Sequence, residues 1–215
     1  MKYYTKIRIF IIILVIIIII FTIFYITKNK NINKNIIKKC ILQEILYIKD
    51  ALSYDDFLKI NKECLNIYPK LVPDNSIAKN RLHVIIPKNN IIEKIFYGNK
   101  FMNLLKNNIG LNVKPSKVLP IEFRYYIINS SMNWHRDQVI TKNIYNCPQI
   151  EVVYTVHNTS DSKTEWVNDK NGYINEIYSF PNSIMITQGN SSFHRVTPIT
   201  NGNRSIIKIA YDIDM

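Results

Sequence analysis

The stretch FHRVTPITNGNRSIIKIAYD, Phe193 to Asp212, carries much of what the sequence says about the fold. Two runs of β-forming residues, FHRVTPI and SIIKIAYD, flank the turn signal Asn201-Gly202, a pattern typical of two strands joined by a short turn. Similar short runs lie upstream: IEFRYYIIN from Ile121, EVVYTVHN from Glu151 and SIMITQGN from Ser183. Several short strands at this spacing predict a sandwich or a jelly roll.

Helical patterns precede these strands. ILQEILYIKDALSYDDFLKINKECLNIY, which begins at Ile41, predicts a strand, a turn and a helix, with Ser53 and Asp56 resembling a capping box. RLHVIIP predicts a further strand, and IIEKIFYGNKFMNLLKNNIG predicts a helix that is interrupted or ends near Gly98. The expected fold class is therefore α+β, mainly β, with helices flanking the β core on its N-terminal side.

The N-terminal part of the chain has a different character. Residues 9–27, IFIIILVIIIIIFTIFYIT, are uncharged, and at about 1.5 Å per residue they span about 28 Å, close to the roughly 30 Å hydrocarbon core of a bilayer. We expect a membrane anchor over residues 1–27, a basic linker over 28–39 and one domain, long enough to be an enzyme, over 40–215. Within that domain, residues 40–117 are expected to support a β core over 118–215.

The formal net charge of +12 first suggests a nucleic-acid partner. Eight of the basic residues precede Glu44, the first acidic residue, and from Cys40 onward 20 basic residues face 16 acidic ones, a balance of only +4. This balance argues against nucleic acid as a partner of the domain. The basic residues after the apolar segment favour a cytosolic domain, as do three cysteines with neither CxxC spacing nor a disulfide framework.

The segment NWHRDQ, Asn133 to Gln138, supplies the candidate chemistry, because His135 precedes Asp137 by two residues. His-x-Asp alone is a weak signal, but His194 begins a predicted strand 57 residues later. Two imidazoles and one carboxylate on one face of a metal leave adjacent positions open, as in the non-haem Fe(II) oxygenases. Arg204, ten residues after His194, suits bidentate binding of a carboxylate.

Taken together, FRYYIINSSMNWHRD, EVVYTVHN and FHRVTPITNGNRSIIKIAYD resemble the 2-oxoglutarate/Fe(II)-dependent dioxygenase superfamily, in its prolyl 4-hydroxylase-like branch. ILYIKDALSYDDFLKI also resembles the strand and helix that open such catalytic domains, so the resemblance runs, with gaps, from about Ile41 to Asp212. The family commonly has a glycine in the loop before the first ligand, where this chain has NSSMNW.

The resemblance implies a double-stranded β-helix (jelly roll) in which His135, Asp137 and His194 hold Fe(II), with 2-oxoglutarate as cosubstrate and O2 as oxidant. Dependence on ascorbate is a further expectation from the family. Halogenating relatives lack the carboxylate ligand, so Asp137 favours hydroxylation. His157, at the end of a predicted strand, is the alternative histidine ligand.

For the cosubstrate, the resemblance implies that Arg204 binds the far carboxylate of 2-oxoglutarate, with Lys208 as the alternative anchor. Tyr125 matches a family position whose hydroxyl often contacts 2-oxoglutarate. Either Thr155 or Tyr154 is expected to line the same region, and the sequence does not choose between them.

The predicted hairpin adds a geometric condition. A strict two-residue turn would pair His194 with Ile209 and point Arg204 to the opposite face, because side chains alternate along a strand. A three-residue loop with Gly202 in the left-handed conformation would pair His194 near Lys208 and bring Arg204 to its face. We predict the second geometry.

The sequence thus predicts a membrane-anchored Fe(II)- and 2-oxoglutarate-dependent dioxygenase that hydroxylates a protein side chain, with proline as the family-based target. The alternative is a non-catalytic membrane or envelope protein that uses the jelly-roll domain as an interaction module. Oxidative demethylation of nucleic acid is disfavoured by the anchor and by the charge of the domain. The target residue, the membrane and the oligomeric state do not follow from the sequence.

Overall fold

The computed structural model describes residues 13–30, 40, 42, 44–74, 78–143, 146–168 and 171–214. The chain divides into two compact units, residues 1–40 and 41–215. In the first unit a helix over Ile13–Lys30 has a mean hydropathy of 2.0 and no buried residue. Its length and composition would allow it to cross a membrane, a property shared by signal sequences. Residues 1–12 of the predicted anchor and 31–39 of the predicted linker lie outside the described residues.

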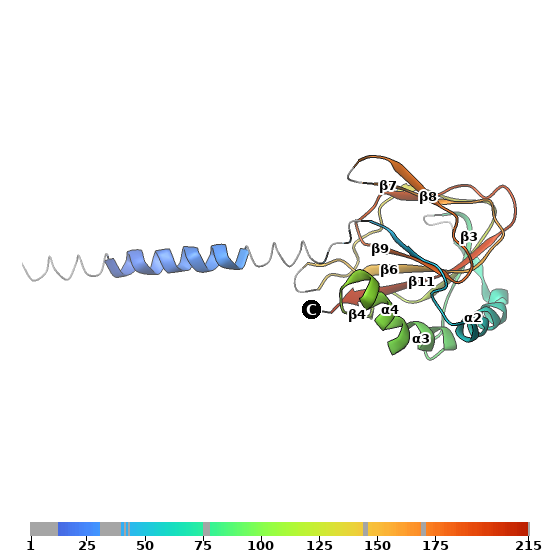
Figure 1. Ribbon diagram of the computed structural model, residues 1–215, viewed down its shortest axis with the longest axis horizontal. Coiled ribbons are helices and arrows are strands. Elements are labelled where there is room, and N and C mark those ends of the chain that lie inside the picture. The colour runs from blue at the N-terminus through green and yellow to red at the C-terminus, as the bar shows by residue number, and fades with distance from the viewer. Residues whose placement is uncertain are drawn as a thin grey trace, which may run out of the picture. The chain divides into compact units, whose positions relative to one another are not determined.

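The second unit is mainly β, as predicted (Figure 1). Its elements, in chain order, are β1 (Leu46–Ile48), α2 (Tyr54–Ile67), a 3-10 turn (Tyr68–Lys70), β2 (Val72–Asp74), β3 (Lys79–Ile85), α3 (Ile91–Phe96), α4 (Asn99–Ile109), β4 (Val113–Pro115), β5 (Glu122–His135), β6 (Ile150–Asn158), β7 (Thr164–Val167), β8 (Ile174–Ile177), β9 (Ser183–Gln188), β10 (His194–Val196) and β11 (Arg204–Ile213).

The strands form two antiparallel sheets that share β5, which is the arrangement of a double-stranded β-helix. The larger sheet has the order β1-β9-β6-β11-β5, with β3 also on β5, and the smaller sheet has the order β5-β10-β7-β8. The chain passes from one sheet to the other at Asn129, which has a φ of 67°. Ser130 holds this break: its hydroxyl donates to the carbonyl of Asn80 at 2.7 Å and accepts from the backbone N–H of Ile127 at 2.8 Å.

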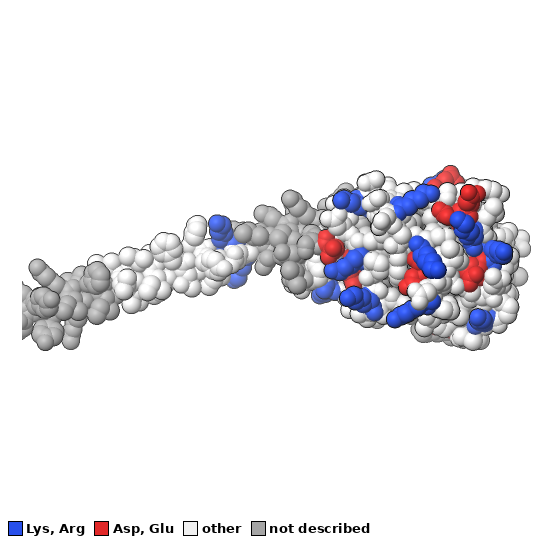
Figure 2. Space-filling view, turned by 90° about the horizontal axis from the view of Figure 1, so that it is seen from below, with Lys and Arg blue, Asp and Glu red and all other residues white. Residues whose placement is uncertain are grey.

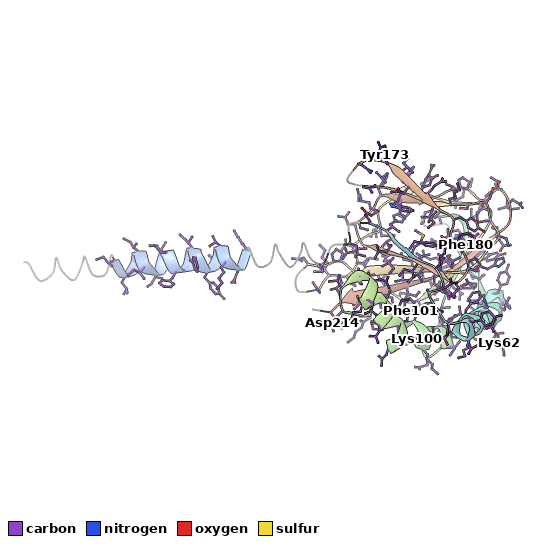
Figure 3. The ribbon with its side chains drawn as sticks, in the orientation of Figure 1. Lys62, Lys100, Phe101, Tyr173, Phe180 and Asp214 are labelled. Atoms are coloured by element: carbon purple, nitrogen blue, oxygen red, sulfur yellow. The ribbon has the colours of Figure 1, made fainter. Side chains whose placement is uncertain are left out.

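The helices cover the outer face of the larger sheet, where an aromatic cluster fills the space between the layers (Figure 1). The ring of Phe96 meets the rings of Phe101 and Tyr154 edge-on, at 4.9 and 5.1 Å between centroids. Tyr211 Oη donates to the carbonyl of Phe96 at 2.8 Å. Phe101 points into this cluster, whereas the side chain of the neighbouring Lys100 points outward (Figure 3). This apolar layer fixes the larger sheet from outside and leaves its inner face for the site.

The local helix predictions are confirmed. α2 begins after Ser53, whose side chain accepts a hydrogen bond from the backbone N–H of Asp56. α3 and α4 are separated at Gly98, where a Cβ atom would lie 2.8 Å from the carbonyl oxygen of Lys94. A side chain at this position would therefore force the first helix away from the second.

The exposed surface over these helices carries charges of both signs. Seen from the side of α2 and α4, Lys and Arg are interspersed with Asp and Glu (Figure 2). Asp56, for example, lies 3.4 Å from Lys59 Nζ and 3.6 Å from Lys100 Nζ. Such mixed pairs are characteristic of a solvated surface and contribute little to stability.

The predicted β10–β11 hairpin is wrong. β10 pairs with β5 and β7, whereas β11 pairs with β4, β5 and β6, so the two strands lie in different sheets. Gly202 has the expected left-handed conformation, with a φ of 74°, but its Cα packs against Thr159, whose carbonyl oxygen would lie 2.3 Å from a Cβ atom. Asp161 accepts hydrogen bonds from the backbone N–H groups of Thr200 and Asn201. The loop is therefore bound to the segment that follows β6 instead of closing a hairpin.

Cys64, in α2, is a buried free thiol. Burial raises the pKa of the Cys64 thiol far above its usual range, so this thiol is unreactive.

Candidate metal centre

Three residues with metal-binding side chains meet at one end of the smaller sheet. His135 is the last residue of β5 and is the Cα partner of His194, the first residue of β10. Asp137 lies in the loop directly after β5. His135 Nε2 lies 3.9 Å from Asp137 Oδ1, and His194 Nε2 lies 3.7 Å from Asp137 Oδ2. One candidate ligand atom from each residue lies within 4.8 Å of the other two, so the three can face a single ion.

Hydrogen bonds orient both imidazoles for this purpose. His135 Nδ1 lies 2.7 Å from the carbonyl oxygen of Asn133, and His194 Nδ1 lies 2.9 Å from that of Ser192. A carbonyl oxygen can only accept, so each Nδ1 carries the proton and each Nε2 presents its lone pair toward Asp137. Burial lowers the pKa of His135, and the neighbouring His194 lowers it further, which favours the neutral form that binds a metal.

The carboxylate of Asp137 is held as well. Thr187 Oγ1 in β9 donates to Asp137 Oδ2 at 3.2 Å, and the backbone N–H of Asn190 donates to the main-chain carbonyl of Asp137 at 2.7 Å. Ligating carboxylates are commonly fixed in this way by neighbouring donors.

An aromatic stack lies beside the two histidines. Trp134 and Phe193, each one residue before a histidine, stack at 5.3 Å between ring centroids with an interplanar angle of 18°. The guanidinium of Arg195 lies 5.0 Å over the Trp134 ring, and Arg195 Nε donates to Glu165 Oε2 at 2.6 Å. Because side chains alternate along a strand, this stack occupies the face opposite the histidines and ties β5 to β10.

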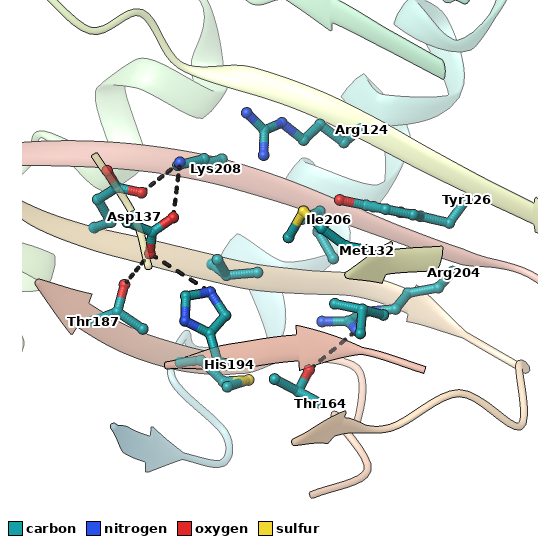
Figure 4. Close-up of a pocket in the computed structure, with 14 residues that line it drawn as sticks. Arg124, Tyr126, Met132, Asp137, Thr164, Thr187, His194, Arg204, Ile206 and Lys208 are labelled. Carbon is teal, nitrogen blue, oxygen red and sulfur yellow. Dashed lines mark hydrogen bonds and ion pairs between the residues drawn. The ribbon is translucent and has the colours of Figure 1, made fainter. Parts of the chain in front are cut away.

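A cavity extends from this cluster through the interior of the β-helix (Figure 4). Asp137, His194, Thr187 and Lys208 lie together at one end, and Arg204, Thr164 and Tyr126 lie at the other. The lining between the two ends is mainly apolar and includes Met132 and Ile206, and its one described cation, Arg124, is the Cα partner of Ile206 and is paired with Glu122. Val153, Met185 and Val196 also line the cavity. We call the two polar parts the metal end and the far end.

The far end contains an unusual charge. Arg204 is 3 % exposed, and its nearest polar contacts are long ones, 3.4 Å to Thr164 Oγ1 and 3.5 Å to Ser179 Oγ. Its Nε has no hydrogen-bond partner, and no described carboxylate forms an ion pair with it. Burial lowers the pKa of Arg204, yet a guanidinium stays protonated in proteins. A buried charge without a counter-ion is costly, so the far end fits an anionic ligand.

The structure places Tyr125 outside this cavity. Its ring meets Tyr68 edge-on at 5.0 Å between centroids, and it borders a separate cavity under α2 with the exposed His157. The adjacent residue Tyr126 faces inward instead and is the Cα partner of Arg204 across β5 and β11. The alternation of the strand explains the difference, and the inward position of Arg204 was the signal that could have identified Tyr126.

Neither Tyr154 nor Thr155 lines the cavity. Tyr154 belongs to the aromatic layer under the helices, where its hydroxyl donates to Asn182 Oδ1 at 3.1 Å, and Thr155 is buried elsewhere. From β6 the cavity receives Glu151 and Val153 instead. Glu151 was not singled out from the sequence, because a buried glutamate in a strand gives no local signal.

No family model and no curated protein matches the sequence. Solved structures do match the fold. The chain is similar to a prolyl-4-hydroxylase from Pseudomonas putida, with a TM-score of 0.60, 12% identity, and coverage of 78% of this chain and 91% of that chain. It is equally similar to a prolyl hydroxylase from Trichoplax adhaerens in complex with a hypoxia inducible factor peptide fragment, with a TM-score of 0.60, 14% identity and coverage of 87% and 92%.

A third match is HygX from Streptomyces hygroscopicus with nickel, 2-oxoglutarate and hygromycin B bound, with a TM-score of 0.57, 9% identity, and coverage of 78% of this chain and 82% of that chain. Identities this low establish a common fold and no more. The chain therefore has the double-stranded β-helix fold of the prolyl-4-hydroxylases and other 2OG-Fe(II) oxygenases that it resembles in structure.

Proposed function

We propose that the chain is an Fe(II)- and 2-oxoglutarate-dependent dioxygenase that hydroxylates a protein side chain. One observation carries this proposal: a metal-ligand set and a buried arginine without a counter-ion occupy opposite ends of a single cavity, whose lining between them is mainly apolar and has one described cation, Arg124, paired with Glu122. A dicarboxylate with a short aliphatic spacer matches a cavity that is polar at both ends and mainly apolar between them.

His135, Asp137 and His194 would hold Fe(II), since two imidazoles and one carboxylate form the donor set of the non-haem Fe(II) oxygenases. When bound, the iron would supply the oxidising chemistry, in which one atom of O2 enters a substrate C–H bond and the other enters succinate as 2-oxoglutarate loses CO2. The protein's own part is to orient the ligands through Asn133, Ser192 and Thr187.

Arg204 would bind the far carboxylate of 2-oxoglutarate, and Tyr126 would border it. The charges of the cavity support a dianion. Arg124 is paired with Glu122, and Lys208 is paired with Glu151, so those four charges cancel. A divalent metal, Asp137 and Arg204 then leave two positive charges, the amount that 2-oxoglutarate neutralises.

The proposed substrate is a protein or peptide. The Trichoplax structure contains a peptide fragment, which supports a protein or peptide substrate, with proline as the family-based target. HygX, by contrast, contains hygromycin B, so proteins with this fold bind molecules of more than one class. The helix Ile13–Lys30 would anchor the enzyme in a membrane and restrict it to targets near that surface.

The test uses the full chain purified in detergent without oxygen, loaded with Fe(II) and 2-oxoglutarate and then exposed to O2. We expect succinate in the absence of any peptide, because these enzymes turn over slowly when uncoupled, and no succinate from His194→Ala. His157→Ala is the matched control, since His157 lies outside the cavity, and it should retain the activity. A folded wild-type protein that forms no succinate would contradict the proposal and favour the non-catalytic interaction module.

A further inference from the structure

A second charged pair lies inside the cavity, at its metal end. Lys208 Nζ in β11 forms an ion pair with Glu151 Oε2 in β6 and lies 3.9 Å from Asp137 Oδ1 (Figure 4). Glu151 is 3 % exposed, and 25 % of the Lys208 side chain is exposed. The cavity thus contains a lysine beside a candidate metal ligand, in a position where it can reach a molecule bound to the metal.

The position of Glu151 is itself fixed. Gln149 Nε2 donates to Glu151 Oε1 at 3.1 Å and to the carbonyl oxygen of Gln138 at 2.7 Å. Gln138 directly follows Asp137, so one amide links the carboxylate that holds Lys208 to the loop that holds the metal ligand. The lysine and the candidate metal ligand therefore belong to a single hydrogen-bonded framework.

Stability alone does not account for this pair, because buried ion pairs contribute little net stability compared with apolar residues of similar size. An ammonium group has three donors. Glu151 takes one, and Asp137 at 3.9 Å is beyond hydrogen-bonding distance, so Lys208 retains donors for a ligand. Among the cavity's described cations, Arg124 is bound by Glu122 at 2.8 Å, and Arg204 lies at the far end. Lys208 is therefore the cation that can contact a ligand at the metal end.

The geometry of β11 places two cations along one side of the cavity. Arg204, Ile206 and Lys208 alternate on the inward face, so the Cα atoms of the two basic residues lie about 13 Å apart at roughly 3.3 Å per residue. Both side chains are long enough to extend toward each other along the cavity, over the apolar surface of Ile206. A short dicarboxylate lying on Ile206 would meet a cation at each end.

On the basis of the function proposed above, we propose that Lys208 binds the carboxylate of the 2-oxo acid that lies next to the metal, while Glu151 holds its ammonium group in place. Arg204 then binds the other carboxylate. The two ends of the cosubstrate are recognised by two residues of the same strand, and each can be tested with a ligand that lacks one end.

The test measures ligand binding instead of turnover. Fe(II)-loaded full chain in detergent is titrated without oxygen, by calorimetry, with 2-oxoglutarate and with 2-oxopentanoate, which has the same length but no far carboxylate. Lys208→Gln should raise the Kd of both ligands about tenfold or more, because a charged hydrogen bond usually contributes that much to affinity. Arg204→Gln should raise the Kd of 2-oxoglutarate to a similar extent and leave the Kd of 2-oxopentanoate unchanged.

Further variants separate ligand binding from folding. Lys208→Gln combined with Glu151→Gln leaves no buried charge unpaired and should show the same loss for both acids. Lys208→Arg should restore part of the affinity. The Kd for Fe(II) is also measured. It should not increase in Lys208→Gln, because a positive charge near the ion has been removed, and it should stay similar to wild type in Lys208→Arg and in the double variant, where the net charge near the ion is unchanged.

Two results would overturn this inference. If Lys208→Gln weakens Fe(II) binding, Lys208 acts only by positioning Asp137. If 2-oxopentanoate binds the double variant as tightly as wild type, the pair has no contact with the ligand. Both results differ from failure of the proposed function, in which the wild-type chain itself would bind neither Fe(II) nor 2-oxoglutarate.

Discussion

The two ends of the cavity differ in how their charges are compensated. At the metal end each imidazole donates to a carbonyl, Asp137 accepts from Thr187, and Lys208 is paired with Glu151. At the far end Arg204 is buried with only long contacts to hydroxyls and no described carboxylate beside it. The metal end is thus organised before any ligand arrives, whereas the far end is completed only by an anion. This difference predicts opposite responses to substitution.

The largest effect is expected at the metal end. Asp137→Ala should weaken Fe(II) binding by more than about 100-fold, because even residues that only support a ligand contribute about 10- to 100-fold. The measurement is an anaerobic metal titration of the full chain. Asp161→Ala is a suitable control, since this exposed carboxylate binds the loop before β11 and lies outside the cavity. Equal metal affinity in the two variants would remove Asp137 from the ligand set.

At the far end, substitution should have two effects of opposite sign. Arg204→Met should raise the Kd for 2-oxoglutarate by about 10- to 100-fold, yet raise the stability of the ligand-free protein by about 1 kcal/mol or more, because an uncompensated buried charge is removed. Thermal melting with and without 2-oxoglutarate checks both parts. A ligand-free Arg204→Met protein that melts lower than wild type would mean that Arg204 is already compensated.

A smaller effect is expected from the aromatic stack behind the histidines. Trp134→Ala removes the contact with Phe193 and the cation–π contact with Arg195, together worth about 1–2 kcal/mol. We expect Fe(II) binding about tenfold weaker, because His135 and His194 are held less firmly. Tyr173→Ala is the control, since Tyr173 is an exposed aromatic residue outside the stack (Figure 3). Unchanged metal affinity in Trp134→Ala would limit the stack to a packing role.

The smallest effect distinguishes the two adjacent tyrosines. Tyr126→Phe should raise the Kd for 2-oxoglutarate a few-fold, the value of one hydrogen bond, because Tyr126 borders the far end. Tyr125→Phe should leave that Kd unchanged, because Tyr125 packs on Tyr68 on the other face of β5. The reverse order of effects would restore Tyr125 as the cosubstrate contact.

The metal-ligand candidates could be predicted from the sequence because their signal is local. His135 and Asp137 are two residues apart, and His194 lies in a run of β-forming residues that follows the Gly189-Asn190 turn signal. The capping of α2 by Ser53 and the break at Gly98 were predictable for the same reason, since each depends on neighbours within one helical turn.

The features that the sequence did not predict depend on contacts between different strands and loops, not on a local signal. The Asn201-Gly202 turn was read as a hairpin, but its partners are Thr159 and Asp161, about forty residues away. Tyr125 was named from the family resemblance, whereas Tyr126 lines the cavity, and a shift of one residue exchanges the two faces of a strand. The pairing of Lys208 with Glu151 depends on the register between β6 and β11, which no local pattern specifies.

The most direct test of the account is an anaerobic spectroscopic titration of the full chain with Fe(II) and then with 2-oxoglutarate. We predict a weak visible charge-transfer band that requires both components, saturates at one 2-oxoglutarate per chain, and is lost in His194→Ala. A folded wild-type protein that gives no band, or a band that persists in His194→Ala, would contradict the assignment of the cavity as an Fe(II)/2-oxoglutarate site.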